Sequence, residues 1–314
     1  MAVYAFIFPG QGSQSVGMGA DLAAAFPSAR AVFEEVDEAL GEKLSKTIFE
    51  GPMEALTSTE NTQPALMAVS MAVLRVLEEQ GGVDLAGKVT LLAGHSLGEY
   101  AALAAGRAFG IADAARLLRT RGLAMQKAVP AGEGGMAALI GATLAQVQEI
   151  CENAAQGGVL EIANDNGGGQ IVISGTMAAI DNAIVLAKEM KIKRAVKLPV
   201  SAPFHSSLMR PAEDVMAEAL AKADIAAPIV PVIANVTAEK VSDPDAIRQA
   251  LTQQVTGRVR WRESVETMTG MGVDTFVEIG AGKVLSGLVR RIDPEVSTCS
   301  VGTPADIETF LKSF

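Results

Sequence analysis

The sequence predicts an α/β fold in which helices cover both faces of a largely parallel sheet. Several short segments are apolar almost throughout, and most are followed by a glycine-rich turn and a stretch with helical periodicity. Strands that are apolar on both faces are typical of parallel sheets, whose two sides are both covered. The predicted strands are VYAFIF (3–8), VTLLAG (89–94), PIVPVIANV (228–236), TFVEIG (275–280) and STCSVG (297–302).

The middle of the chain predicts a second unit with a different order of elements. Strands are expected at 135–142, 158–166, 169–175 and 194–200, and helices at 143–156 and 176–191. The resulting order βαββαβ is the ferredoxin-like split unit. We therefore expect residues 130–198 to form a ferredoxin-like subdomain. It is inserted into a discontinuous α/β domain made of residues 1–129 and 199–314.

The composition excludes several classes of function. The 314 residues are 49% hydrophobic and 20% charged, and no apolar run is long enough for a membrane span. A net charge of −10 argues against nucleic acid as a partner. Two cysteines and two histidines without ligand spacing predict no metal site, and reduced cysteines favour a cytoplasmic protein. GQGSQ (10–14) lacks the G-K-[ST] of a phosphate loop, so no cofactor is expected.

The segment GHSLG (94–98) has the G-x-S-x-G pattern of a nucleophile elbow. Its glycines allow the sharp strand-to-helix turn that lifts the Ser96 hydroxyl off the end of a sheet. The base can only be one of two histidines, His95 or His205. Adjacent side chains at such a turn project in different directions, so we expect His95 to support the elbow by hydrogen bonding. By elimination His205, at a domain junction after the insert, is the base.

A buried arginine is predicted in the helix ADAARLLRTRGLAM (112–125). At about 100° per residue, Leu117, Leu118, Arg121 and Met125 share one face, and the neighbouring arginines point toward solvent. An arginine within an apolar stripe needs an anionic partner, because burial of an unpaired charge is costly. That partner is either a carboxylate of the protein or the carboxylate of a substrate, held by two hydrogen bonds.

Seven blocks of the sequence resemble signature motifs of the malonyl-CoA:acyl-carrier-protein transacylase family, in the family's order and across nearly the whole chain. They are FPGQGSQSVGMG (8–19), ENTQPAL (60–66), GHSLGEYAAL (94–103), RGLAMQKAVPAGEGGMAAL (121–139), GQIVISG (169–175), PVSAPFHSSLM (199–209) and EIGAGKVL (278–285). The resemblance implies a hydrolase-like α/β domain with a ferredoxin-like insert and an active site between them. The sequence departs from the family pattern at Ala281, at Gly167–Gly168 and in TGRVRW (256–261).

The activity implied by this resemblance is transfer of a malonyl group from malonyl-CoA to the phosphopantetheine thiol of a holo acyl carrier protein. The route is ping-pong through a malonyl-Ser96 ester, and it supplies fatty acid synthesis. His205 is the implied base, steered by a backbone carbonyl near Gln254. The backbone N–H groups of Gln11 and Leu97 are the implied oxyanion hole.

The resemblance also assigns residues that contact the acyl group. Arg121 matches the position that holds the malonyl carboxylate, which favours a substrate as its partner. Phe204, beside the base, resembles the bulky residue that excludes a 2-methyl substituent, and plain core packing accounts for it nearly as well. Gln63, Met125 and Asn164 match positions that line the pocket.

Carrier proteins of this kind are acidic, so docking on a chain that is itself acidic requires local basic patches. The candidates are KIKRAVK (191–197), RVRWR (258–262) and Arg290–Arg291. We expect a monomer. Two other classes remain open: a serine hydrolase, against which the absence of a histidine near the C-terminus argues, and a non-catalytic carrier-binding scaffold, against which an intact Ser96, His205 and Arg121 argue.

Overall fold

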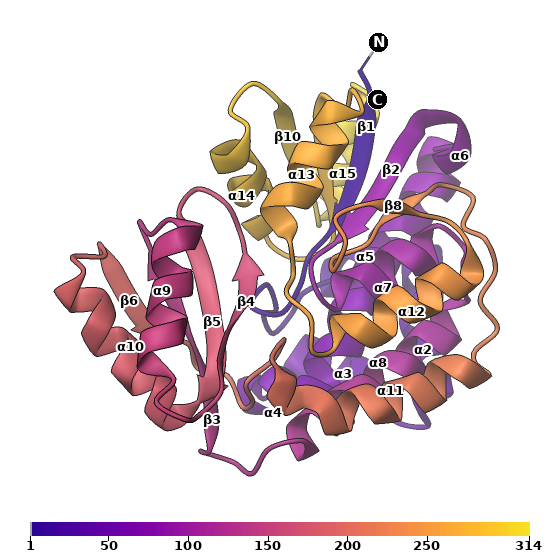
Figure 1. The fold of residues 1–314 in the computed structure, drawn as a ribbon. Helices are drawn as coiled ribbons and strands as arrows, with labels where there is room; N and C mark the ends of the chain where they lie inside the picture. The colour runs from indigo at the N-terminus through magenta and orange to yellow at the C-terminus, as the bar shows by residue number, and fades with distance from the viewer. Residues whose placement is uncertain (1) are drawn as a thin grey trace.

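The computed structural model describes residues 2–314 and contains two separate sheets (Figure 1). The larger sheet has six strands in the order β10-β9-β1-β2-β7-β8. Its strands are β1 (Tyr4–Phe8), β2 (Val89–Gly94), β7 (Val232–Ile233), β8 (Lys240–Val241), β9 (Thr275–Ile279) and β10 (Ser297–Val301). Neighbouring strands run parallel except for β7 and β8. The predicted α/β class with a parallel core is confirmed.

Helices outside the insert pack around this sheet, and some of them cover each of its two faces. They are α1 (Ala20–Ala25), α2 (Pro27–Leu40), α3 (Leu44–Glu50), α4 (Met53–Thr57), α5 (Thr59–Gly81), α6 (Leu85–Lys88), α7 (Gly98–Ala105), α8 (Ile111–Lys127), η1 (Ser207–Met209), α11 (Arg210–Lys222), α12 (Pro244–Gln254), α13 (Trp261–Gly270), α14 (Val284–Ile292) and α15 (Pro304–Leu311). Within residues 2–314, none of the helices is both long and apolar enough to cross a bilayer.

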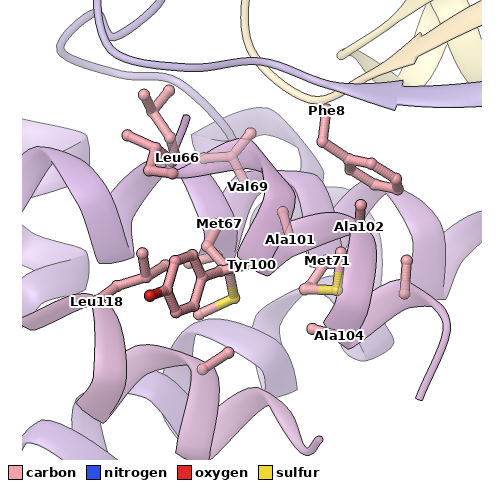
Figure 2. Close-up of a cluster of buried hydrophobic side chains, with 14 of the residues drawn as sticks. Phe8, Leu66, Met67, Val69, Met71, Tyr100, Ala101, Ala102, Ala104 and Leu118 are labelled. Carbon is pink, nitrogen blue, oxygen red and sulfur yellow. The ribbon is translucent and has the colours of Figure 1, made fainter. Parts of the chain in front are cut away.

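Alternate side chains of β1 enter two different cores, as the pleat of a strand requires. Phe6 and Phe8 pack with residues of α5, α7 and α8, whereas Ile7 packs with residues of α13 and α14. Figure 2 shows part of the first core, with the ring of Tyr100 from α7 beside Leu118 from α8. The sheet is therefore enclosed between two helical layers, and its carboxyl ends are the edge at which the site forms.

The predicted strand 228–236 is much shorter in the structure, where only Val232–Ile233 form β7. Pro228 and Pro231 interrupt the segment, because a proline has no N–H to donate to a sheet. The carbonyl of Pro231 still accepts a hydrogen bond from the Leu92 N–H at 2.9 Å. The segment then turns back into β8, which makes this edge of the sheet antiparallel.

The second sheet has the predicted βαββαβ order. Its elements are β3 (Gly134–Ile140), α9 (Leu144–Ala154), β4 (Leu160–Asp165), β5 (Gln170–Thr176), α10 (Met177–Glu189) and β6 (Arg194–Lys197). The strands lie in the order β4-β5-β3-β6, all antiparallel, and both helices share one core with the sheet. The ferredoxin-like arrangement is confirmed, and the limits 130 and 198 stay a prediction.

Candidate active site

Ser96 stands at the sharp turn between β2 and α7. Its φ of 55° lies in the left-handed region, which a residue with a side chain adopts only where the surroundings hold it. The Oδ1 of Asn235 accepts the Ser96 N–H at 2.7 Å. A Cβ on Gly98 would lie 2.3 Å from the Phe8 carbonyl oxygen, and one on Gly94 would lie 1.9 Å from the Gly98 oxygen. Both glycines are therefore required by the turn.

The hydroxyl of Ser96 lies within hydrogen-bond distance of His205. Ser96 Oγ and His205 Nε2 are 2.8 Å apart. On the other side of the ring, Nδ1 faces two backbone carbonyls, that of Gln254 at 2.9 Å and that of Gly257 at 3.1 Å. A carbonyl can only accept, so Nδ1 carries the proton and Nε2 is left as the acceptor for the serine hydroxyl. Among residues 2–314 the partners of Nδ1 are these two carbonyls and not a carboxylate, unlike the Ser-His-acid arrangement.

The surroundings of His205 keep its ring neutral. Burial, followed by the nearby Arg121 guanidinium, lowers the pKa of His205 to about 3, although the two carbonyls oppose this shift. A neutral ring has its Nε2 lone pair available. The dyad is thus poised to remove the Ser96 proton rather than to donate one.

His95 lines the same cavity as Ser96 and His205, but its ring is hydrogen-bonded to another residue. Its Nε2 is 2.8 Å from Oδ1 of Asn166, which follows β4 in the insert, and its ring lies 5.7 Å from that of Trp261. Burial lowers the pKa of His95, although the hydrogen bond to Asn166 Oδ1 opposes this shift. Its hydrogen bond connects the elbow to the insert, whereas the elbow turn itself is held by Asn235. His95 makes no hydrogen bond to Ser96 among the described residues.

Arg121 is buried on α8 and points at the serine. Its Nη1 donates to Gln63 Oε1 at 2.8 Å, and its Nη2 donates to Gln254 Oε1 at 2.9 Å and to Ser96 Oγ at 3.2 Å. Within residues 2–314 no carboxylate lies within 4.0 Å of the guanidinium, and Nε has no hydrogen-bond partner. Of the two partners that the sequence left open, the internal salt bridge is therefore not formed, and the cation that lines the cavity donates its hydrogen bonds only to neutral oxygens of residues 2–314.

One cavity of about 550 Å³ collects these groups, a volume in the range of small-molecule sites. The predicted site residues that line it are Gln11, Gln63, His95, Ser96, Leu97, Arg121, Met125, Asn164, Phe204 and His205. Gln254 does not line the cavity. It contacts the site from behind, through its carbonyl to His205 and its side-chain amide to Arg121.

Gln11 and Leu97, the implied oxyanion-hole residues, line the cavity that contains Ser96. Leu97 directly follows the serine and caps α7, and Gln11 lies in the loop after β1. Among residues 2–314 neither N–H has another acceptor. The loop approaches the elbow closely, because a Cβ on Gly10 would lie 2.6 Å from the His95 carbonyl oxygen. The two N–H groups are thus free to bind a developing negative charge.

The insert contacts the segment that orients His205. The backbone of Val259 pairs with β4, donating to Ala163 O at 2.8 Å and accepting from the Asp165 N–H at 3.0 Å. Arg262 Nε donates to Asp165 Oδ2 at 3.0 Å. Gly257, two residues before this pairing, presents its carbonyl to His205. The segment 256–261, which departs from the family pattern, therefore still supplies a carbonyl to the base.

Sequence reasoning missed two residues that hold the elbow. Asn235 accepts the Ser96 N–H and donates its Nδ2 to Gly94 O at 2.7 Å. Glu99 accepts from the Asn235 N–H at 3.0 Å and from Gln254 Nε2 at 2.7 Å. Each carried a signal: Asn235 is the polar residue that ends an apolar run, and Glu99 is the acidic residue of an otherwise apolar helix.

Comparison with known proteins decides the family. A family model described as the acyl transferase domain matches residues 5–301. Malonyl CoA-acyl carrier protein transacylases of Bacillus subtilis and Escherichia coli are each 45% identical to the chain, over 100% and 99% of it and 98% and 100% of their own lengths. The chain belongs to the malonyl-CoA:acyl-carrier-protein transacylase family.

Solved structures of transacylases have the same fold. An acyl-carrier-protein-S-malonyltransferase from Bartonella henselae is 58% identical with a TM-score of 0.97, covering 99% of this chain and 98% of that one. A malonyl-transacylase in complex with its type II PKS acyl-carrier protein is 42% identical with a TM-score of 0.96, covering 100% of both chains. The resemblance read from the motifs is confirmed.

The residues that line the pocket of this transacylase come from both the α/β domain and the insert. Phe204 is buried directly before His205, and Met125 lies one turn beyond Arg121 on α8. Gln63 Nε2 lies 3.7 Å from the Met125 sulfur, while its oxygen accepts from Arg121. Asn164 comes from β4 of the insert. A group bound between these residues would contact both parts of the chain.

The three basic segments of the transacylase differ in how many of their basic side chains are paired with carboxylates. In KIKRAVK, Lys191, Lys193 and Arg194 are exposed, and only Lys197 is paired, with Asp181 at 2.5 Å. In RVRWR every arginine is paired with a carboxylate, Arg258 and Arg260 with Glu263, and Arg262 with Asp165 and Glu266. Arg290 and Arg291 are exposed on α14, whose Val284, Leu285 and Leu288 line the cavity. The charges of RVRWR are thus the least available to an acidic partner.

Proposed function

We propose that this transacylase moves the malonyl group of malonyl-CoA to the phosphopantetheine thiol of a holo acyl carrier protein through a malonyl-Ser96 ester. One observation carries the proposal: Ser96 Oγ lies between a neutral base, His205, and a buried cation without a carboxylate partner, Arg121. The proposal is supported by the 45% sequence identity to full-length relatives that are named malonyl CoA-acyl carrier protein transacylases.

In the first half-reaction Ser96 attacks the thioester carbonyl of malonyl-CoA. His205 Nε2 takes the hydroxyl proton as the O–C bond forms, and the backbone N–H groups of Gln11 and Leu97 receive the oxyanion. One donor of this kind contributes roughly 3 kcal/mol of transition-state stabilisation. The intermediate then collapses, the C–S bond breaks, and the protonated His205 returns its proton to the CoA thiolate.

Arg121 binds the free carboxylate of the malonyl group in this proposal. Two charge-assisted hydrogen bonds from one guanidinium favour a carboxylate, whereas an acetyl group would leave the buried charge unpaired. Binding of the carboxylate also offsets the Arg121 charge, which is one of the causes that lower the pKa of His205. The malonyl group thereby makes the base stronger at the moment when the base is needed.

In the second half-reaction the pantetheine thiol of the carrier attacks the malonyl-Ser96 ester. His205 removes the thiol proton and then protonates Ser96 Oγ, so the enzyme returns to its starting state. The complex of a related malonyl-transacylase with its acyl-carrier protein supports a carrier as the acceptor. We assign the product to fatty acid synthesis, as the family resemblance implies, and expect a monomeric, cytoplasmic enzyme.

KIKRAVK (191–197) is the carrier-docking segment that we favour, because three of its basic residues are exposed and free of carboxylates among residues 2–314. Reversal of the charges at Lys191 and Lys193 should raise the KM for the carrier at low salt, since exposed charges steer an acidic partner. The same reversal at Lys312, an exposed lysine that is paired with Glu308, is the control. An unchanged KM would remove KIKRAVK as the docking segment.

Intact mass spectrometry separates the three candidate functions. The protein is mixed with malonyl-CoA, and its mass is recorded before and after addition of holo carrier protein. A transacylase gains a malonyl adduct that moves to the carrier. Loss of the adduct to water without a carrier identifies a hydrolase, and absence of any adduct identifies a scaffold.

A further inference from the structure

Glu99 is a buried carboxyl behind the site that the proposed reaction does not use. It lies in the first turn of α7, three residues after Ser96, and is 1% exposed. Its Oε2 accepts hydrogen bonds from Gln254 Nε2 at 2.7 Å and from the Asn235 N–H at 3.0 Å. Within residues 2–314 no cationic nitrogen lies within 4.0 Å of it. An acidic side chain is rarely this buried without a cation in direct contact, because burial penalises the charged form.

The amide of Gln254 connects Glu99 to Arg121. Its Nε2 donates to Glu99, and its Oε1 accepts from Arg121 Nη2 at 2.9 Å. The reversed amide would present its NH₂ to the guanidinium and its oxygen to the carboxylate, so both contacts would be lost. Glu99 therefore fixes the orientation in which the Gln254 oxygen faces the cation.

Glu99 is also the carboxylate whose negative charge raises the pKa of Arg121. The charged and titratable groups that act on it are Arg121 from α8 and the adjacent Tyr100, and Arg121 in turn acts on His205. Burial raises the pKa of Glu99 to about 7, although the hydrogen bonds from Asn235 and Gln254 and the charge of Arg121 oppose the rise. The carboxyl therefore changes its charge near pH 7.

We propose that Glu99 is a positioning residue that sets the affinity of Arg121 for the acyl carboxylate, and that it takes up one proton when that carboxylate binds. This inference rests on the proposed function, in which a malonyl carboxylate meets Arg121. In the empty site one cation and one anion balance. The malonyl group adds a second anion, which a single guanidinium cannot offset, so a proton from the solvent joins the Glu99 carboxylate.

The hydrogen bonds leave a place for this proton. Both accepted bonds use Oε2, and Oε1 of Glu99 has no hydrogen-bond partner among residues 2–314. A protonated Oε1 leaves the bonds to Gln254 and Asn235 in place, so the elbow and the amide orientation survive the change. An acetyl group brings no charge and should cause no uptake.

Linked proton uptake makes malonyl binding depend on pH. Above about pH 7 the affinity for malonyl-CoA should fall by up to about tenfold per pH unit, the slope of one linked proton. The affinity for acetyl-CoA should lack this slope. The ratio of the two dissociation constants cancels the titration of the CoA phosphates, which both ligands share.

The test uses the full-length Ser96→Ala protein, which binds without turnover. Calorimetric titration with malonyl-CoA and with acetyl-CoA, in buffers of different ionisation enthalpy, gives the number of protons taken up. We expect about half a proton per malonyl-CoA at pH 7, since Glu99 is then about half protonated already, and none per acetyl-CoA. The added change Glu99→Gln keeps an acceptor oxygen but removes the charge, and should abolish both the uptake and the pH slope. Glu79→Gln, an exposed carboxyl on α5, is the matched control.

The outcomes separate this inference from the proposed function. If the Ser96→Ala protein prefers malonyl-CoA to acetyl-CoA but takes up no proton, the inference is wrong and the function stands. Proton uptake that persists in the Glu99→Gln protein belongs to another group such as His205. That result also contradicts the inference and leaves the proposed function standing. The Ser96→Ala measurement decides the matter even if the Glu99→Gln protein does not fold. No preference for malonyl-CoA at all contradicts the proposed function as well.

Discussion

Arg121 Nη2 lies 3.2 Å from Ser96 Oγ, so the group that we propose to bind the acyl carboxylate and the proposed nucleophile are direct neighbours. The two residues come from different elements, since Ser96 lies in the turn before α7 and Arg121 lies on α8. A carboxylate bound to this guanidinium is necessarily close to the nucleophile. Selection of a short dicarboxylic acyl group and its attack are thus two consequences of one geometry.

Arg121→Ala should change which acyl group is accepted. Removal of the guanidinium takes away the partner of the malonyl carboxylate and leaves neutral acyl groups unaffected. We expect the malonyl-over-acetyl ratio of kcat/KM to fall by roughly 30-fold or more, equivalent to about 2 kcal/mol or more. Arg119→Ala is the control, because Arg119 lies on the same helix but pairs with Glu42 and Asn61. An unchanged ratio in the Arg121 variant would exclude the carboxylate-binding role.

Gly10→Ala should damage the oxyanion hole and leave acyl selection intact. The added Cβ would lie 2.6 Å from the His95 carbonyl oxygen, so the loop that carries Gln11 must move away from the elbow. Loss of one oxyanion donor lowers kcat by roughly 100-fold or more. Gly270→Ala, where no atom lies within 4 Å of the new Cβ, is the matched control. Full activity of the Gly10 variant would show that the N–H of Gln11 is not needed.

Phe204→Ala should admit branched acyl groups. Phe204 is buried, lines the cavity and directly precedes His205, so its ring can exclude a 2-methyl substituent. Enlarging an apolar pocket by such a change alters discrimination by about 1–3 kcal/mol, or roughly 10- to 200-fold in the methylmalonyl-to-malonyl ratio of kcat/KM. Val200→Ala, another lining residue, controls for a general gain in volume. If both variants change the ratio equally, Phe204 has no special part in it.

Glu99→Gln should change how folding stability depends on pH. The pKa of Glu99 is raised from 4.5 to about 7 in the folded chain, so the folded state binds more protons between these values. The wild type therefore loses the stability due to Glu99 as pH rises from 4.5 through 7, by up to roughly 1.4 kcal/mol per pH unit. His205 has the opposite sign, because its pKa is lowered, but its effect is common to both proteins. Urea unfolding at pH 5 and pH 8 measures this difference. The free energy of unfolding of the variant, relative to that of the wild type, should be higher at pH 8 than at pH 5.

The comparison with an exposed carboxyl keeps this measurement specific. Glu79→Gln should give the same difference from the wild type at both pH values, because Glu79 is exposed on α5. A Glu99→Gln protein whose difference from the wild type is also independent of pH would contradict the raised pKa of Glu99.

The sequence was enough to predict the fold class and the order of elements in the insert, and it singled out Ser96, the two histidines and Arg121. Ser96 lies in a pattern with a steric cause, since the turn excludes side chains at Gly94 and Gly98. Only two histidines are present, and the helical period alone buries Arg121. Each of these inferences depends on local geometry or on simple counting, which a single sequence contains.

The remaining contacts depend on residues that are far apart in the chain. Asn235 and Gln254 reach the elbow across separations of 139 and 158 residues, which no local pattern reveals, and only the family resemblance pointed to Gln254. The short β7 could have been anticipated from Pro228 and Pro231, which cannot donate to a ladder. The pairing of Arg260 with Glu263 could also have been anticipated, because the two residues are one helical turn apart.

Site mapping of the acyl adduct tests the central claim most directly. The protein is quenched after mixing with malonyl-CoA, digested, and its peptides are analysed by mass spectrometry, alongside the Ser96→Ala and His205→Ala proteins. We predict a malonyl group on Ser96 in the wild type, none in Ser96→Ala, and acylation slowed by several orders of magnitude in His205→Ala, on the order of 10⁴-fold or more. A malonyl group on any other residue of the wild type, or an adduct that survives Ser96→Ala, would contradict the account.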